Sequence, residues 1–278
     1  MLAALALVAS GLALPGVAGS GPALGAAARA LGASGSGSGR LGSSVEQVLQ
    51  AVPSQVPPAP VGAIFSSKGS THYCSGSVVW STTGDVVLTA AHCISGTGAG
   101  VVFVPGFADG HEPYGRWTVE AAYAAPAWLT GQDPEDDFAF LVVAPQLIGG
   151  KEVQVQSLTG AYDLSVAPAS GSRVTVVAYP AGTGGLPVRC APLVRWTDDF
   201  PSFKCGGYPG GTSGGPWLTV ASGRTDTVDG VIGGLHQGGC REQVSYSPVF
   251  GEMTRAIYEE AVDRAAADTL PAAGPSGC

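Results

Sequence analysis

Short runs of β-branched and aromatic residues, each ended by Gly, Ser or Pro, most limit how this chain can fold. With 43 Gly and 21 Pro in 278 residues, turns recur too often for long helices. Such runs predict strands, and the lack of helical crossovers between them argues against a parallel sheet. The runs cover residues 63–65, 77–80, 85–88, 101–104, 117–119, 138–143, 153–155, 174–178, 193–196, 217–220, 231–232 and 244–250.

A break at residues 149–150 divides these runs into two sets of about six. We therefore predict an all-β protein of two packed barrels or sandwiches, formed by residues 61–150 and 151–252. A 3.6-residue period then places Met253, Ile257, Ala261 and Ala265 on one stripe. This pattern predicts a C-terminal α-helix at 253–267 that packs against the second barrel, followed by a tail at 268–278.

Two further segments precede the first barrel. Residues 1–30 form a predicted signal peptide or apolar leader, because residues 1–19 are almost entirely Ala, Leu, Val and Gly. The basic residues that usually open a signal are missing, but Gly11, Pro15 and Gly16 interrupt the run and disfavour a membrane anchor. Residues 31–60 are rich in Gly and Ser and then in Pro, which predicts a disordered linker or propeptide.

Charge and cysteine content narrow the function. The net charge is −8 and the pI is about 4.8, so no basic patch is available for nucleic acid. Six cysteines without C-x-x-C spacing indicate disulfides in an oxidising compartment, which with the leader predicts secretion. The four histidines show no clustered metal-binding spacing, so we expect no metal and no cofactor.

Three motifs carry chemistry: L-T-A-A-H-C at 88–93, D-D-F-A-F-L at 136–141 and G-G-T-S-G-G-P at 210–216. A serine hydroxyl needs a neighbouring base to become a nucleophile, and an imidazole suits this role near neutral pH. A carboxylate on the far ring nitrogen fixes the tautomer and stabilises the imidazolium. We therefore predict Ser213 as nucleophile, His92 as base and Asp137 as the orienting carboxylate. Asp133 and Asp136 compete for the last role, but Asp137 directly precedes the apolar run 138–143.

In this order, the three motifs resemble those of the chymotrypsin-like (trypsin-like) serine peptidase family over residues 63–258. The resemblance implies two packed six-stranded antiparallel β-barrels of the chymotrypsin-like type, followed by a C-terminal α-helix. The same resemblance implies a secreted serine endopeptidase that forms an acyl-enzyme on Ser213. It also implies an oxyanion hole made by the N–H groups of Gly211 and Ser213. Polypeptides are the expected substrates of this monomer, which has no membrane partner after processing.

The serine motif departs from the common family form, which has aspartate where Thr212 stands. In zymogen-regulated members that aspartate pairs with a newly cut N-terminus, so this switch is not expected here. Thr212 makes the chain similar to bacterial secreted branches, including glutamyl endopeptidases. We expect any propeptide to act by assisting folding or by occluding the site.

The resemblance also suggests substrate-binding residues, namely Gly207, Tyr208, Gly233, Gly234 and His236. Trypsin-type cleavage after Arg or Lys needs a carboxylate six positions before the serine, where this chain has Gly207. A preference for Arg or Lys is therefore disfavoured. The stretch around His236 looks like the G-x-H-x-G-G segment of glutamyl endopeptidases, whose histidine helps to bind a substrate carboxylate. A structural or rim role for His236 is the alternative.

The remaining histidines and the cysteines have structural interpretations. His72 matches a family position that packs near the active site, and His111 is expected in a loop. Cys74 and Cys93 match the family's bridge around the histidine loop. Locality favours Cys190 with Cys205 and leaves Cys240 with Cys278, while Cys205 with Cys240 stays an alternative.

Two other functions compete with the peptidase. An α/β-hydrolase esterase is suggested because residues 211–215 fit G-x-S-x-G and Asp229 and His236 follow in the order of that fold. Their spacing is too short, and alternating strands and helices are missing. The second rival is a catalytically inactive protease-like binding protein, which would usually have lost a triad residue.

Overall fold

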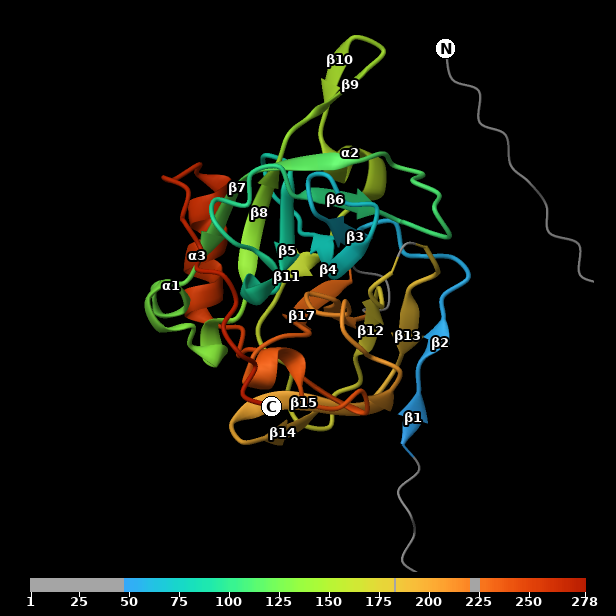
Figure 1. The fold of residues 1–278 in the computed structure, drawn as a ribbon, viewed down its shortest axis with the longest axis vertical. Coiled ribbons are helices and arrows are strands. Elements are labelled where there is room, and N and C mark those ends of the chain that lie inside the picture. The colour runs from blue at the N-terminus through green and yellow to red at the C-terminus, as the bar shows by residue number, and fades with distance from the viewer. Residues whose placement is uncertain (1–47, 183, 221–225) are drawn as a thin grey trace, which may run out of the picture. The chain divides into compact units, whose positions relative to one another are not determined.

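The structure is a computed structural model, and it describes residues 48–182, 184–220 and 226–278. Within these ranges the chain is mostly β, with short strands and three α-helices (Figure 1). The strands of the first half are β3 (Val61–Phe65), β4 (His72–Val78), β5 (Val86–Thr89), β6 (Val102–Pro105), β7 (Trp117–Ala124), β8 (Ala139–Val143), β9 (Gln146–Ile148) and β10 (Lys151–Val153). Those of the second half are β11 (Asp163–Leu164), β12 (Thr175–Ala178), β13 (Val188–Cys190), β14 (Arg195–Thr197), β15 (Phe200–Gly206), β16 (Pro216–Thr219), β17 (Thr227–Val231) and β18 (Val244–Tyr246). The helices are α1 (Pro126–Gly131), α2 (Val155–Thr159) and α3 (Glu252–Val262), with 3-10 turns η1 (Ala91–Cys93), η2 (Pro134–Asp136) and η3 (Leu235–Gly238).

The first half is a closed antiparallel barrel with strand order β3-β4-β5-β8-β7-β6. Its strands are apolar on both faces because both faces are covered. Along β8, Leu141 belongs to one buried cluster of the barrel, whereas Phe140 belongs to a cluster shared with second-half residues such as Val231. Successive side chains of a strand point to opposite faces, so such a strand appears as a continuous apolar run. This confirms the strand runs predicted for the first barrel. Two predicted runs of the second half are partly wrong, because Val155 begins helix α2 and β18 ends at Tyr246.

The second half contains a six-stranded sheet, ordered β11-β17-β16-β12-β13-β2, and a four-stranded sheet of β1, β15, β14 and β18. Strands β1 (Leu49–Gln50) and β2 (Val52–Pro53) belong to this half, although they precede the first barrel in the sequence. The disulfide Cys190–Cys205 joins β13 to β15 and so links the two sheets. The mostly β, chymotrypsin-like fold class predicted from the sequence is confirmed, although the pairs β1–β15 and β11–β17 are parallel.

The prediction of a disordered linker is wrong for residues 48–60. Strand β1 pairs with β15, β2 pairs with β13, and the Ala51 N–H donates to the Gly206 carbonyl at 2.8 Å. A Pro-rich segment cannot build an apolar core, but its extended backbone can still pair at the edge of a sheet. The composition of the segment says little about such backbone pairing. The predicted leader 1–30 and residues 31–47 lie outside the described residues.

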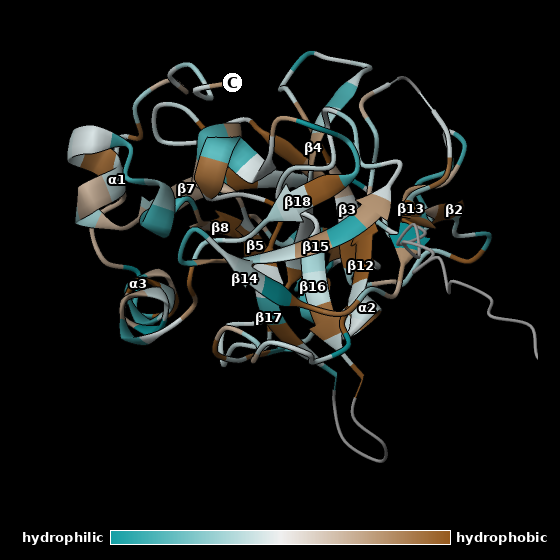
Figure 2. Cartoon of the chain, turned by 90° about the horizontal axis from the view of Figure 1, so that it is seen from below, coloured by the Kyte–Doolittle hydropathy of each residue, from teal (hydrophilic) through white to brown (hydrophobic). Residues whose placement is uncertain are grey.

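The C-terminal helix is present but shorter than predicted. Helix α3 covers Glu252–Val262, and Arg264 has a left-handed φ of 58° that ends the helical path. The helix contacts β7 and β8 of the first barrel, so the prediction that it packs against the second barrel is wrong. In Figure 2, hydrophobic residues concentrate on the interior strands and hydrophilic ones on α3 and outer loops. The segment predicted as a tail packs on the first barrel: Leu270 is 2% exposed and pairs with Gly96. None of the described helices is long and apolar enough to cross a membrane.

Candidate active site

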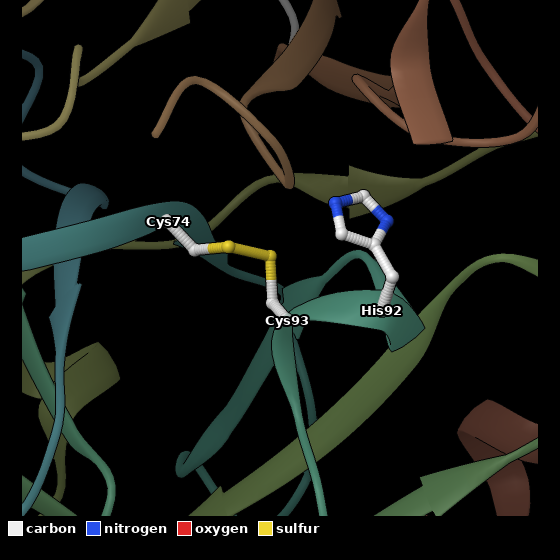
Figure 3. Close-up of side chains that lie close together, drawn as sticks. All are labelled: Cys74, His92 and Cys93. Carbon is white, nitrogen blue, oxygen red and sulfur yellow. A yellow bond between two sulfur atoms is a disulfide. The ribbon is translucent and has the colours of Figure 1, made fainter. Parts of the chain in front are cut away.

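His92 lies in η1, the turn that follows strand β5. The next residue, Cys93, forms a disulfide with Cys74 of strand β4, and both cysteines are buried. Figure 3 shows the His92 ring projecting from the same turn, beside the disulfide. Because the crosslink fixes the turn to a neighbouring strand, it limits the positions that the imidazole can reach.

Asp137 is the carboxylate that contacts this histidine. It is fully buried, and its Oδ2 atom lies 2.8 Å from His92 Nδ1. Its Oδ1 atom accepts from the His92 backbone N–H at 2.9 Å, and Oδ2 also accepts from the Gly234 N–H at 2.9 Å. The carboxylate is therefore held by donors from both halves of the fold.

The two competing acids, Asp133 and Asp136, do not contact His92 in the described chain. Asp133 caps η2 by accepting from the Glu135 N–H at 3.0 Å, and it is exposed. Burial raises the pKa of Asp136 above its usual value, and the nearby charges of Asp133 and Glu135 raise it further. Of the three candidates, Asp137 alone has a contact with His92 within the described chain. The sequence feature that predicted this role was the position of Asp137 directly before the apolar run 138–143, which contains β8.

Ser213 lies in a tight loop between β15 and β16, and it is half-buried. Gly211 has a φ of 93°, and a Cβ there would lie 2.1 Å from the Ala181 nitrogen, so only glycine fits. The Thr212 hydroxyl donates to the Pro209 carbonyl at 2.6 Å, and Thr212 is 2% exposed. The Thr212 side chain therefore has its hydrogen-bond partner inside the loop. An aspartate at this position would need a cation from outside the loop as its partner.

Two close contacts bring the serine loop next to the histidine turn. The Ser75 N–H of β4 donates to the Ser213 carbonyl at 2.7 Å. A Cβ on Gly214 would lie 2.2 Å from Thr89 Oγ1 and 3.0 Å from the Ala90 nitrogen, and these residues directly precede η1. Among the residues that the structure describes, no hydrogen bond joins the Ser213 hydroxyl to the His92 ring. In free enzymes such bonds are often long and tighten only with substrate.

The loop also presents backbone donors. The N–H groups of Thr212 and Gly214 are used internally, donating to Pro209 and Ile232 respectively. Within the described ranges, no backbone or side-chain acceptor is paired with the N–H of Gly211 or Ser213. Two such donors beside a serine are suited to stabilise a negatively charged oxygen.

A cavity of about 210 Å³ opens at Ser213. One side is formed by Tyr208–Ser213 residues of the serine loop and the other by residues 237–242. Of the predicted substrate-binding residues, Tyr208 lines this cavity, whereas Gly207, Gly233, Gly234 and His236 do not. Gly207 lies against Ala51 of the N-terminal segment, where its added Cβ would be 3.3 Å from the alanine Cβ.

Sequence reasoning missed both charged residues of this cavity. Arg241 and Glu242 both line it and both are exposed. They follow Cys240 after a series of glycines, whose backbone path cannot be inferred from composition. Their opposite charges place one cation and one anion on this wall.

The other predicted candidates, Asp229 and His236, do not line the cavity at Ser213. Asp229 is bonded by the hydroxyls of Thr219 and Thr227, so it is not available to His236 as an α/β-hydrolase would require. His236 lines a neighbouring cavity, and its Nδ1 lies 3.1 Å from the Ser276 carbonyl. This geometry argues for the structural or rim role of His236 over the glutamate-binding one.

His72 packs in an aromatic cluster with Phe65, Phe107 and Tyr179, and it is 1% exposed. Burial lowers its pKa below the usual value, and a contact with the Gly184 carbonyl partly opposes this shift. His111 lies in a turn, where it pairs with Ala108.

The six cysteines form the disulfides Cys74–Cys93, Cys190–Cys205 and Cys240–Cys278. Two groups have the proximity that metal ligands need: His92 with the first pair and His236 with the third. A cysteine binds metal as a thiolate, and these sulfur atoms are bonded to each other. As folded, neither group offers a thiolate ligand.

Comparison with known proteins places the chain among the chymotrypsin-like serine peptidases. The crystal structure of the protease Anisep from Arthrobacter nicotinovorans is similar at a TM-score of 0.64 and 28% identity, over 76% of this chain and 99% of that one. The thermostable serine protease AL20 from an extremophilic microorganism is similar at 0.62 and 25% identity, over 74% of this chain and 98% of that one. A match to the trypsin-like peptidase domain covers residues 74–225, more than half of the chain. The chain belongs to this family, and it is a serine endopeptidase.

One further solved structure, of lower sequence identity, shows similarity of the fold alone. A Glu endopeptidase structure is similar at a TM-score of 0.59 with 15% identity, over 77% of this chain and 97% of that one. No match was found among curated proteins.

Proposed function

We propose that the chain is a secreted serine endopeptidase that hydrolyses polypeptides through an acyl-enzyme on Ser213. His92 takes the Ser213 proton as the hydroxyl attacks the scissile carbonyl, and returns a proton to the leaving amine. Asp137 holds the imidazole tautomer and stabilises the imidazolium. The N–H groups of Gly211 and Ser213 bind the oxyanion, and water then releases the acyl group.

The buried contact between His92 and Asp137 carries this proposal. The carboxylate is 0% exposed and accepts from both the ring and the backbone of His92. A buried charge is costly unless it is paired and hydrogen-bonded, so such an arrangement is rarely incidental. Its position next to a half-buried serine with two available N–H groups gives each group a role in acyl transfer.

Secretion is supported by the three disulfides, which persist in oxidising compartments, and by the apolar leader. Thr212 supports an enzyme whose oxyanion loop needs no cleaved N-terminus, because its hydroxyl is satisfied inside the loop.

A fluorophosphonate probe tests the proposal, since it reacts only with an activated serine. The wild type should be labelled, whereas Ser213→Ala should not. Ser276→Ala serves as the matched control and should be labelled like the wild type. A folded wild type that stays unlabelled would support an inactive, binding function instead.

A further inference from the structure

Two adjoining cavities lie between helix α3 and the chain around strand β11. The first has a volume of about 220 Å³ and is lined by Trp80, Asp163, Leu164, Arg255 and Tyr258. The second has a volume of about 270 Å³ and is lined by Leu164, Ser165, Val166, Gly251 and Arg255. Because the cavities share Leu164 and Arg255, they form one groove, which we call the α3 groove.

The α3 groove lies away from the serine loop. Strand β4 runs between them: the Ser75 N–H of this strand donates to the Ser213 carbonyl, and Trp80 follows its other end. Five residues of extended chain at about 3.3 Å each place these two positions about 17 Å apart. Among the residues that the structure describes, none lines both the α3 groove and the cavity at Ser213. The groove is therefore separate from the catalytic cleft.

An exposed tryptophan forms one wall of the α3 groove. Trp80 is 51% exposed, although tryptophan is on average a highly buried residue. Its N–H donates to the Tyr162 carbonyl at 2.8 Å, and its carbonyl accepts from the Tyr258 hydroxyl at 2.7 Å. The Tyr258 ring in turn packs edge-to-face on the buried Phe140 ring, with centroids 5.7 Å apart. Trp80 is therefore anchored through its backbone while half of its area stays open to a ligand.

The groove also carries two charged side chains of opposite sign, Asp163 and Arg255. A carboxylate offers only hydrogen-bond acceptors, whereas a guanidinium offers five donors in a planar fork. Arg255 pairs with Glu259 one turn along α3 at 3.3 Å, yet its side chain is 65% exposed. It therefore keeps donors for a ligand. With one charge of each sign, the lining favours no net charge on the ligand.

We propose that the α3 groove binds a neutral glycan, with one sugar ring stacked on Trp80 and hydroxyl groups bonded to Asp163 and Arg255. The C–H groups on the face of a sugar ring match the electron-rich face of an indole. Neighbouring hydroxyls both donate and accept, so they satisfy a carboxylate and a guanidinium together. A charged ligand would meet one like charge in the groove, whereas a neutral polyol meets none. Glycan binding here goes beyond the proposed function and does not depend on it.

Retention on an array of neutral and charged linear oligosaccharides tests this assignment. Trp80→Ala removes the stacking face, and Arg255→Met keeps the side-chain length but removes the donors. Leu147→Ala is the control, because Leu147 is 77% exposed and lines neither cavity. It lies on the hairpin of β9 and β10, which projects from the body of the molecule (Figure 1). Ser213→Ala shows whether binding is independent of turnover, and fluorophosphonate labelling checks the catalytic machinery of the other proteins.

We expect the wild type, Ser213→Ala and Leu147→Ala to retain neutral oligosaccharides over charged ones. Titration with the best-retained oligosaccharide should change the tryptophan fluorescence of these three proteins. In Trp80→Ala the Kd should rise at least about tenfold, and in Arg255→Met about 2- to 10-fold. Labelling of both variants should match that of the wild type.

A wild type that retains no neutral oligosaccharide would overturn the inference, as would equal retention by Trp80→Ala or an equal loss in Leu147→Ala. Trp80-dependent binding of unstructured peptides in place of oligosaccharides would also overturn it, in favour of a site for polypeptides. A wild type that binds oligosaccharides but is not labelled would refute the proposed function and support this inference. If Trp80→Ala does not fold, Arg255→Met decides the outcome.

Discussion

Replacement of Asp137 by asparagine exchanges one buried carboxylate oxygen for an NH₂ group. The carboxylate accepts three hydrogen bonds, from the His92 ring, the His92 backbone and the Gly234 N–H. With the amide nitrogen at the Oδ2 position, it faces the Gly234 N–H and forces the ring proton onto Nε2, so the ring cannot accept the serine proton. With the nitrogen at the Oδ1 position, the tautomer is kept, but the amide faces the His92 N–H. Either way one buried donor loses its acceptor.

The expected magnitudes follow from these contacts. A buried donor left unpaired should lower the free energy of unfolding by about 1–3 kcal/mol. Losing a hydrogen bond to a charged group, worth about 1.5–3 kcal/mol, should lower kcat roughly 10- to 150-fold. Reversal of the ring tautomer adds to this loss, and the total should approach about 10⁴-fold, as for the equivalent change in a serine protease triad.

Steady-state kinetics on a fluorogenic peptide measure kcat and KM, and denaturant unfolding measures stability. Most of the loss should be in kcat. Asp136→Asn and Asp133→Asn are the matched controls, because neither side chain contacts His92 in the described structure. A drop in kcat of less than tenfold for Asp137→Asn, or an equal drop for Asp136→Asn, would refute the assigned role.

Three further predictions concern stability. Burial lowers the pKa of His72, so below about pH 6.5 the unfolded chain binds a proton that the folded protein disfavours. The contribution of His72 to the free energy of unfolding should therefore be complete above about pH 6.5 and should fall as the pH drops below that value. His72→Gln should therefore show a smaller loss of Tm between pH 7.5 and 5 than the wild type, and equal losses would contradict this. Replacing both Cys74 and Cys93 by serine opens a loop with a sequence separation of 19 residues and should cost about 3 kcal/mol in denaturant unfolding, whereas an unchanged midpoint would show that the crosslink is dispensable. Thr212→Val removes the hydroxyl bond to Pro209 and should lower stability by about 0.5–1.5 kcal/mol and slow fluorophosphonate labelling; unchanged labelling would mean that this bond does not shape the loop.

The features that could be predicted from the sequence are those that a local residue pattern determines. The apolar runs of β3 and β8 are continuous because both faces of these strands are buried, and this composition predicts a strand wherever it packs. The cysteine after His92 and the run after Asp137 are likewise local signals. Their roles in catalysis stay predictions, although the structure brings the two side chains within 2.8 Å of each other.

Features that depend on backbone pairing or on distant contacts could not be predicted. Strands β1 and β2 pair through main-chain groups, which a Pro-rich composition does not reveal. The path of the chain after Gly234 depends on consecutive left-handed residues and on the C-terminal segment, so the positions of His236 and Arg241 could not be inferred from their neighbours. The cavity that His236 lines is invisible in the sequence for the same reason, because its walls come from three separate segments.

The central claim is that Ser213 is acylated during turnover. Intact and peptide mass spectrometry of the wild type, quenched in acid during hydrolysis of an activated ester, measures this directly. The account predicts an acyl adduct on the peptide that contains Ser213, and its absence from Ser213→Ala. Continued hydrolysis with the adduct on another residue, or with the same rate in Ser213→Ala, would contradict it.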